Sequence, residues 1–352
     1  MPSLDQILDL VESTINKYDR KKWVDISLNN QNYHFTKEIV RGGRMKNDAN
    51  STACEWKVQT SYQDSTRYAD LYDTDTHVVG DHLTNASSKW MKITDNWSFD
   101  KDENVFNQGP EQIIDHVMVR QHAMMNGVFE FLENKMWTQP TSDTARPYEI
   151  LGIPYWIVKN ATQGFNGGDP SSANAGAGGI LTASVPNWKN YTDTYATVSS
   201  TDAIEKVVRA MEFCNFEAPD PHAAHESTKM PSYGLYSTYN FVEELRRHLR
   251  GQNDNLGEDA AAMMKGAPYI MSVPVKWVSV LSNSAATAYD STDPLYGINW
   301  NSFAFHSKAG NWMRETKNVQ SATQHNVYVN YIDAWGQFVC KNRRTNFVMY
   351  QA

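Results

Sequence analysis

The sequence predicts an α+β fold with a long β-ribbon and a long helix, and three observations lead to this prediction. Apolar residues alternate with polar ones across residues 54–99, recur at helical spacing across 110–136, and alternate again across 326–350. A period of two is typical of half-buried strands, whereas recurrence every three or four residues is typical of amphipathic helices. With 352 residues, the chain can bury one large core or two modest ones.

Residues 54–99 are interpreted as a two-stranded ribbon with a polar, turn-rich segment from Asp64 to Ser88. The apolar side chains of its two halves each share one parity: Cys54, Trp56, Val58 and Tyr62 in the first half, and Met91, Ile93, Trp97 and Phe99 in the second. An isolated two-stranded hairpin is marginal in water, so this ribbon needs a surface to lie on. That surface is either the rest of this chain or another copy, and the length of the ribbon favours another copy.

The helices are predicted from apolar stripes and end signals. Residues 3–18 have an amphipathic pattern behind Ser3, which fits a packed terminal helix or an arm laid across a neighbouring subunit. Pro110 suits the first position of a helix that extends to about residue 136, roughly 40 Å at about 1.5 Å per residue. Its stripe comprises Ile114, Val117, Met118, Met125, Val128, Leu132 and Met136.

Two further helices are predicted in the middle of the chain. Asp202 and Glu205 have the spacing of a capping box at the start of one of them. The other begins with Ser237 as N-cap and extends to Arg250, before Gly251.

The remaining segments are predicted as strands or loops. Residues 268–281 are typical of strand with a proline at an edge or bulge, and 326–350 of two strands around Gly336. The glycine-rich stretch 163–179 is predicted as a loop. It lacks the Lys-Ser or Lys-Thr of a phosphate-binding loop, so it does not predict nucleotide binding.

Charge and composition exclude several classes of function. The net charge of −8 and the pI of about 5.7 argue against a surface that coats nucleic acid or an anionic membrane. No apolar run reaches about 18 residues, so no membrane span is expected. The first residues lack a basic segment followed by an apolar core, so no signal peptide is expected. The three cysteines are odd in number and far apart, which argues against a disulfide framework.

No catalytic, metal-binding or cofactor-binding motif is recognised, and no cofactor is expected. His222 and His225 lie three residues apart next to Glu226, but the order differs from both zinc-protease patterns. A solvated loop is the alternative to a metal site there. Cys214 falls within a helical stripe and is interpreted as core rather than nucleophile.

Several segments carry a resemblance to a known family, and they occur in order along nearly the whole chain. They are residues 104–116 (NVFNQGPEQIIDH), 151–158 (LGIPYWIV), 178–180 (GGI), 186–190 (PNWKN) and 325–344 (HNVYVNYIDAWGQFVCKNRR). They resemble the major capsid proteins of tailed bacteriophages, which have the Hong Kong 97-type fold.

This resemblance implies a domain organisation. Residues 1–40 become an N-terminal arm and 41–103 an extended E-loop that lies over the neighbouring subunit. Residues 104–200 become a peripheral domain with the spine helix, and 322–352 its return strands. Residues 201–321 become the axial domain.

The resemblance also implies a structural, non-enzymatic function in the virion. The subunits, made in the host bacterial cytoplasm, would form hexamers and pentamers of an icosahedral head shell. That shell would enclose double-stranded DNA without sequence-specific binding or a membrane. Implied partners are a separate scaffolding protein, a portal and cement proteins. The alternatives are a decoration or tail protein, or a hydrolase of unfamiliar type. Particles of megadalton mass in light scattering would favour the capsid interpretation. A well-behaved monomer with a small-molecule pocket would favour the enzyme interpretation.

The residues expected at contacts between subunits are aromatic, aliphatic and basic. They are Trp56, Val58, Arg67, Tyr68, Trp90, Ile93 and Trp97 of the ribbon, with Arg41, Arg44, Arg343 and Arg344. The acidic runs at 73–75 and 100–103 are the expected partners of the arginines, because a guanidinium can pair bidentately with carboxylates. Alternation places Lys341 and Arg343 on one strand face, with a solvated strand end as the alternative.

Overall fold

A computed structural model describes most of the chain. The described residues are 28, 32–48, 52–62, 65–74, 79–102, 110–215, 232–251, 268–282, 284 and 289–352. The predicted helix at 3–18 and the histidines of 222–225 lie outside these residues. Two large sheets and one separate hairpin make up the β structure of the described part.

The first sheet has five strands and is organised around one long strand. Its members are β1 (Met45–Asp48), β4 (Met91–Asp100), β11 (Phe303–Lys308), β12 (Arg314–Gln320) and β13 (Val327–Cys340). The first half of β13 lies between β4 and β12, and its second half pairs with β11. Strand β1 extends the sheet by parallel pairing with β11.

The second sheet has seven strands and carries two helices. In spatial order its strands are β5 (Gly164–Gly167), β6 (Asn190–Tyr195), β14 (Phe347–Gln351), β10 (Leu295–Asn299), β7 (Tyr233–Ser237), β9 (Val273–Trp277) and β8 (Tyr269–Ile270). Helices α5 (Glu205–Cys214) and α6 (Tyr239–Gly251) share a hydrophobic cluster with this sheet. Pro274 pairs with the edge strand β8, as the sequence predicts for a proline near an edge.

A two-stranded hairpin of β2 (Ala53–Gln59) and β3 (Leu83–Lys89) stands apart from both sheets. The predicted pairing of the two alternating halves of 54–99 is therefore wrong. β2 pairs with β3, while β4 pairs along all its residues with β13. Alternation specifies which face of a strand is buried, and it does not specify the partner strand.

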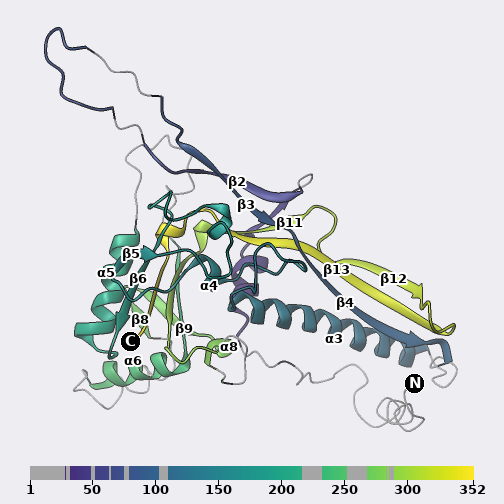
Figure 1. The fold of residues 1–352 in the computed structure, drawn as a ribbon. Coiled ribbons are helices and arrows are strands. Elements are labelled where there is room, and N and C mark those ends of the chain that lie inside the picture. The colour runs from purple at the N-terminus through teal and green to yellow at the C-terminus, as the bar shows by residue number, and fades with distance from the viewer. Residues whose placement is uncertain are drawn as a thin grey trace.

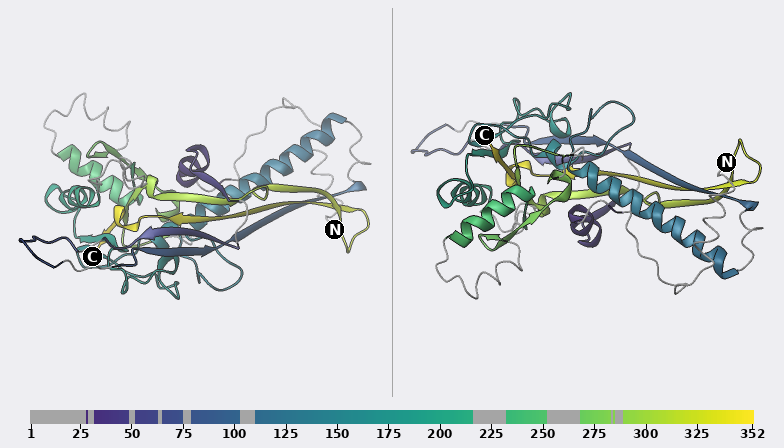
Figure 2. Two further views of the ribbon diagram at one scale, coloured as in Figure 1. Left: turned by 90° about the horizontal axis from the view of Figure 1, so that it is seen from above. Right: turned by 90° about the horizontal axis from the view of Figure 1, so that it is seen from below.

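The predicted long helix is confirmed as α3 (Pro110–Met136). It packs against β4, and in Figure 1 the two extend together with β12 and β13 to one side. Figure 2 shows α3 along the same elongated part from two further directions. Val128, Leu132 and Met136 of the predicted stripe are buried, whereas Met118 is half exposed.

Short helical segments connect the longer elements. They are η1 (Thr36–Arg41), α4 (Ile153–Trp156), η2 (Ala177–Gly179), η3 (Ser200–Ile204), α8 (Ser279–Ser282), η5 (Trp300–Ser302) and η6 (Arg343–Thr345). Among the described residues, no helix combines the length and the apolar character that a membrane span needs.

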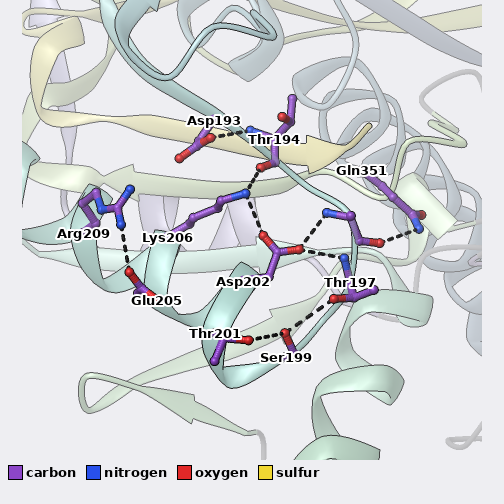
Figure 3. Close-up of polar contacts among 11 residues, drawn as sticks. Asp193, Thr194, Thr197, Ser199, Thr201, Asp202, Glu205, Lys206, Arg209 and Gln351 are labelled. Atoms are coloured by element: carbon purple, nitrogen blue, oxygen red, sulfur yellow. Dashed lines mark hydrogen bonds and ion pairs between the residues drawn. The ribbon is translucent and has the colours of Figure 1, made fainter.

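The predicted capping box at Asp202 does not form. Asp202 lies inside η3, and its carboxylate accepts hydrogen bonds from the backbone N–H of Ala196 (2.8 Å) and Thr197 (2.9 Å) (Figure 3). Lys206 bonds both this carboxylate and the carbonyl of Thr194 at 2.7 Å. Asp202 thus connects the segment after β6 to the following helix and does not cap that helix.

The N-cap predicted at Ser237 is also wrong. Ser237 is the last residue of β7, and its hydroxyl donates to the carbonyl of Pro294 at 3.0 Å. The helix after it nevertheless spans the predicted residues.

The closing segment differs from the two strands predicted around Gly336. Strand β13 continues through Gly336, where a Cβ atom would lie 2.5 Å from the ring of Phe305. The glycine is needed for close approach rather than for a turn. The chain turns after Cys340, and Lys341 and Arg343 lie in that turn rather than on one strand face.

The sheets do not follow the predicted domain boundaries. Strands β11 and β12 precede residue 321 but belong to the sheet of β4 and β13. Strand β6 precedes residue 201 and β14 follows residue 322, yet both belong to the seven-stranded sheet. The chain therefore crosses between the sheets more often than a division into consecutive segments allows.

Candidate functional site

The most unusual surface of the chain is the loop between β2 and β3, which projects beyond both sheets in Figure 1. Its large apolar side chains have little cover from the part of the chain that the structure describes. Leu71 is 85 % exposed and Tyr62 75 %, and Tyr68, Tyr72 and Val79 are essentially fully exposed. Single exposed apolar residues are normal, but a group of them marks a surface that binds another protein.

Sequence reasoning found Tyr68 but missed Leu71, Tyr72 and Val79. These residues are scattered through a polar stretch without a period, so no strand or helix pattern singled them out. The only sequence signal was the presence of large apolar residues in a segment otherwise typical of solvated turns.

The base of the hairpin is anchored on its own chain. Cys54 is fully buried, and the ring of Trp56 meets that of Trp156 edge-on at 6.0 Å. Val58 also packs on the main hydrophobic cluster. The predicted apolar parity of this strand is confirmed, but its inner half faces the chain's own core. Trp56 and Val58 stay proposed contact residues only through their exposed parts.

A groove of about 580 Å³ follows the outer half of the hairpin. Residues 56–62 form one wall, and the turns at 185–188 and 341–344 form the other. Within the described part of the chain β2 pairs only with β3, so the second edge of β2 faces this groove. The indole Nε1 of Trp56 is buried and finds no acceptor among the described residues. Such an edge can accept an added strand or an apolar segment.

Arg67 is paired within its own loop. Its guanidinium forms an ion pair with Asp73 and donates to the carbonyl of Thr74 at 2.7 Å. The predicted pairing of this arginine with the acidic run at 73–75 therefore exists, but inside one chain.

The ribbon residues of β4 and its neighbour Trp90 face the core of their own chain. Trp90 is only 6 % exposed, so its prediction as a contact between subunits is wrong. Ile93 and Trp97 are half-buried against the main cluster. Trp97 lies 5.7 Å from Phe99, which stacks on Tyr328 of the paired strand.

Arg343 is the clearest correction among the basic residues. Its side chain is fully buried, and it donates to the carbonyls of Trp156 (2.7 Å), Trp188 (2.9 Å) and Gly168 (2.8 Å). Burial lowers its pKa to about 10, so it remains charged at neutral pH. Arg343 ties three loops of one subunit together and is not available to a neighbour.

The other basic residues have different environments. Arg44 bonds the carboxylate of Glu38 at 3.4 Å and its carbonyl at 3.1 Å, so it stabilises the segment after η1. Arg344 donates to Asn187 at 2.6 Å and so joins the two turns that form one wall of the groove. The side chain of Arg41 lies outside the described part.

Two further surfaces complete the candidates. Helix α3 has three partly exposed large apolar side chains, Met118, Val119 and Phe131, which lie at different positions around its axis. A second hollow of about 510 Å³ contains Lys159, whose amine is committed to Asp290 and donates to Thr292 at 2.9 Å. Burial lowers the pKa of Lys159, but this pairing keeps the amine from acting as a nucleophile.

Comparison with known proteins gives a likeness of fold and no likeness of sequence family. No family model and no curated protein matches the chain. Among solved structures, the capsid asymmetric unit of Cyanophage A-1(L) matches with a TM-score of 0.59 at 14 % identity, over 96 % of this chain and 95 % of that chain. The capsid of the native GTA particle gives 0.59 at 10 % identity, over 97 % and 96 %. A chain of Gordonia phage Cozz gives 0.52 at 12 % identity, over 97 % and 92 %. The chain therefore has the α+β fold of these proteins along nearly its whole length.

Proposed function

We propose that this chain is the major capsid protein of a tailed bacteriophage, a subunit that assembles into the icosahedral head shell around double-stranded DNA. The observation that carries the proposal is the likeness to capsid chains over nearly the full length of both partners. The exposed apolar loop at the end of a two-stranded hairpin supports it, because a lone subunit leaves that surface in water.

We assign the parts of the fold as the resemblance implies, with boundaries adjusted to the sheets. Residues 1–40 are the N-terminal arm, and the β2–β3 hairpin with its loop is the E-loop. The five-stranded sheet with α3 is the peripheral domain. The seven-stranded sheet with α5 and α6 is the axial domain at the centre of hexamers and pentamers.

The loop surface around Tyr68 and Leu71 is proposed to lie on the neighbouring subunit. The proposed receiving surface is helix α3 of that subunit, where Met118, Val119 and Phe131 offer partly exposed apolar area at separate positions. Repetition of one such contact around a symmetry axis closes a shell from a single kind of subunit.

The acidic balance of the chain supports a shell that encloses DNA rather than one that coats it. A net charge of −8 offers little for counterion release at a phosphate backbone. A scaffolding protein, a portal and cement proteins are the expected partners, and no enzymatic activity is proposed.

Electron microscopy and light scattering of the native material test the function. Closed particles of megadalton mass are expected. Native material that consists only of a small, well-behaved monomer would contradict the proposal.

Paired variants test the role of the loop. Leu71→Ser removes an 85 % exposed side chain of the loop, and Leu181→Ser removes a 46 % exposed leucine elsewhere as control. We expect soluble, folded subunits from both and a loss of shells only from Leu71→Ser. Normal shell yield from Leu71→Ser combined with Tyr68→Ser would mean that the loop is not the contact proposed here.

A further inference from the structure

Three potential metal-binding side chains meet at the base of the hairpin. Asp48 ends β1, Cys54 lies on β2, and His306 lies on β11, and their donor atoms all lie within 4.8 Å of one another. Cys54 is fully buried and His306 is 7 % exposed. These residues come from three strands, and none of them belongs to a recognisable motif in the sequence.

The histidine of this cluster has an unused nitrogen. Its Nδ1 lies 2.6 Å from a carboxylate oxygen of Asp48, and its Nε2 is buried without a hydrogen-bond partner. Burial lowers the pKa of His306, and the hydrogen bond and charge of Asp48 oppose this effect. If Asp48 and His306 bind the same ion, the imidazole ring has to turn to bring Nε2 to it, and bonds to the ion replace the hydrogen bond between the two side chains.

We propose that Asp48, Cys54 and His306 form a binding site for a thiophilic divalent cation such as Zn²⁺. Sulfur, nitrogen and oxygen donors are the zinc ligands of proteins, with bond lengths of about 2.0–2.3 Å. Donor atoms of a tetrahedral zinc therefore lie about 3.3–3.6 Å apart. The observed donor atoms lie within 4.8 Å of one another, and the hydrogen-bonded pair of Asp48 and His306 is 2.6 Å apart, so the side chains would have to rearrange to bind an ion, with water completing the coordination.

The charges of the bound site balance. The thiolate of Cys54 and the carboxylate of Asp48 together neutralise a divalent cation, so no net charge is buried. In the metal-free chain burial, and to a smaller extent the charge of Asp48, raises the pKa of Cys54 to about 12. The thiol proton must therefore leave to solvent when the metal–sulfur bond forms.

The position of the site gives it a structural consequence. Cys54 belongs to the hairpin, whereas Asp48 and His306 belong to the five-stranded sheet. A bound ion would fasten the base of the hairpin to that sheet and fix the direction in which the loop projects. This inference does not depend on the proposed function, because the site lies within one subunit.

Cobalt is the probe, because thiolate-bound Co²⁺ has a charge-transfer absorption in the near ultraviolet. The intact metal-free chain is titrated with Co²⁺ and then with Zn²⁺, and native mass spectrometry counts the ions. We expect one ion per chain, a thiolate–cobalt band that Zn²⁺ abolishes, and a higher melting temperature with Zn²⁺ that a chelator reverses.

The three buried cysteines supply matched controls. Cys54→Ser and His306→Gln are expected to lose the cobalt band and at least ten-fold in affinity, whereas Cys214→Ser retains both, because Cys214 is buried away from the cluster. Failure of the unaltered chain to bind one equivalent overturns the proposal, even if the variants do not fold. A band that persists in Cys54→Ser overturns it as well.

Discussion

Strands β2 and β4 have the same alternating pattern in the sequence, yet they meet different surroundings. β4 pairs with β13 from Met91 to Asp100 and has α3 packed on it. β2 pairs only with β3 among the described strands. Within the apolar parity of β2 and the residues after it, Cys54 is fully buried, Trp56 and Val58 are half-buried, and Tyr62 is 75 % exposed.

This difference shows that the alternation in a strand's sequence predicts which of its faces is buried but does not predict its partner strand. Apart from the end residues Ala53 and Asp100, the residues of one parity are buried or half-buried in both strands and those of the other parity are exposed. Among the described residues each strand has one partner strand, but β4 also has α3 packed on it, whereas this chain covers only the base of the β2–β3 hairpin. The outer half of the hairpin is therefore the better candidate for a contact with a second copy.

The largest effect on the free energy of unfolding is expected from a substitution in β13, the partner strand of β4. Ile332 of β13 is 1 % exposed and belongs to the main cluster. Ile332→Ala should lower the free energy of unfolding by about 2–5 kcal/mol, because it removes buried methyl groups and leaves a cavity. Val79→Ala, in the exposed loop, should change it by less than about 0.5 kcal/mol. Denaturant unfolding of unassembled subunits measures both. Equal effects at the two sites would remove the distinction between the two regions.

Acid should weaken the part of the fold around β7 and β9 rather than the loop of the hairpin. His34 bonds the carbonyl of Trp277 through Nε2 at 2.8 Å and lies edge-on to Tyr236. Burial lowers its pKa from 6.5 to about 4; Lys276 and Lys37 act in the same direction, while the bond to Trp277 and the charge of Glu38 oppose it.

The direction of the pH dependence of stability follows from the lowered pKa of His34. Between about pH 6.5 and 4 the unfolded chain binds more protons at this site than the folded chain, so stability falls as the pH falls. The loss at this site amounts to at most about 3 kcal/mol. His34→Gln should flatten the pH dependence of the unfolding free energy in this window, and the exposed His325→Gln serves as control. An unchanged slope in His34→Gln would exclude His34 as the source.

The parts of the fold that the sequence predicted are those with local causes. Helix α3 was predicted because its stripe and its proline lie within one segment. The pairing of Met91 with Gly336 was not predicted, because nothing in either segment identifies the other. The same holds for His306 and Asp48, which bond across 258 positions of the sequence.

The sequence predicted those features of the candidate site that depend on residue type alone. Tyr68 was expected at a contact and is exposed. Arg343 was expected at a contact because arginine is suited to bidentate pairing with carboxylates at interfaces, but its guanidinium is surrounded by carbonyls of its own chain. Carbonyl groups carry no signature in the sequence, so the side chains alone could not reveal this burial.

The smallest expected effect on the stability of the subunit concerns Arg67. Substitutions there test whether its ion pair with Asp73 supports assembly by holding the conformation of the loop within one chain. The ion pair with Asp73 is exposed on both sides, and such pairs contribute about 0–1 kcal/mol. Arg67→Glu should therefore leave the subunit folded but lower the yield of shells, since the reversed charge repels Asp73 and alters the loop that carries Tyr68 and Leu71. The exchange Arg67→Glu with Asp73→Arg should restore the yield if the pair acts within one chain. Failure of the exchange to restore assembly would mean that Arg67 binds a carboxylate of the neighbouring copy instead. Normal shells with a selective loss of DNA packaging would mean that Arg67 faces nucleic acid, and both interpretations of this charge would then be wrong.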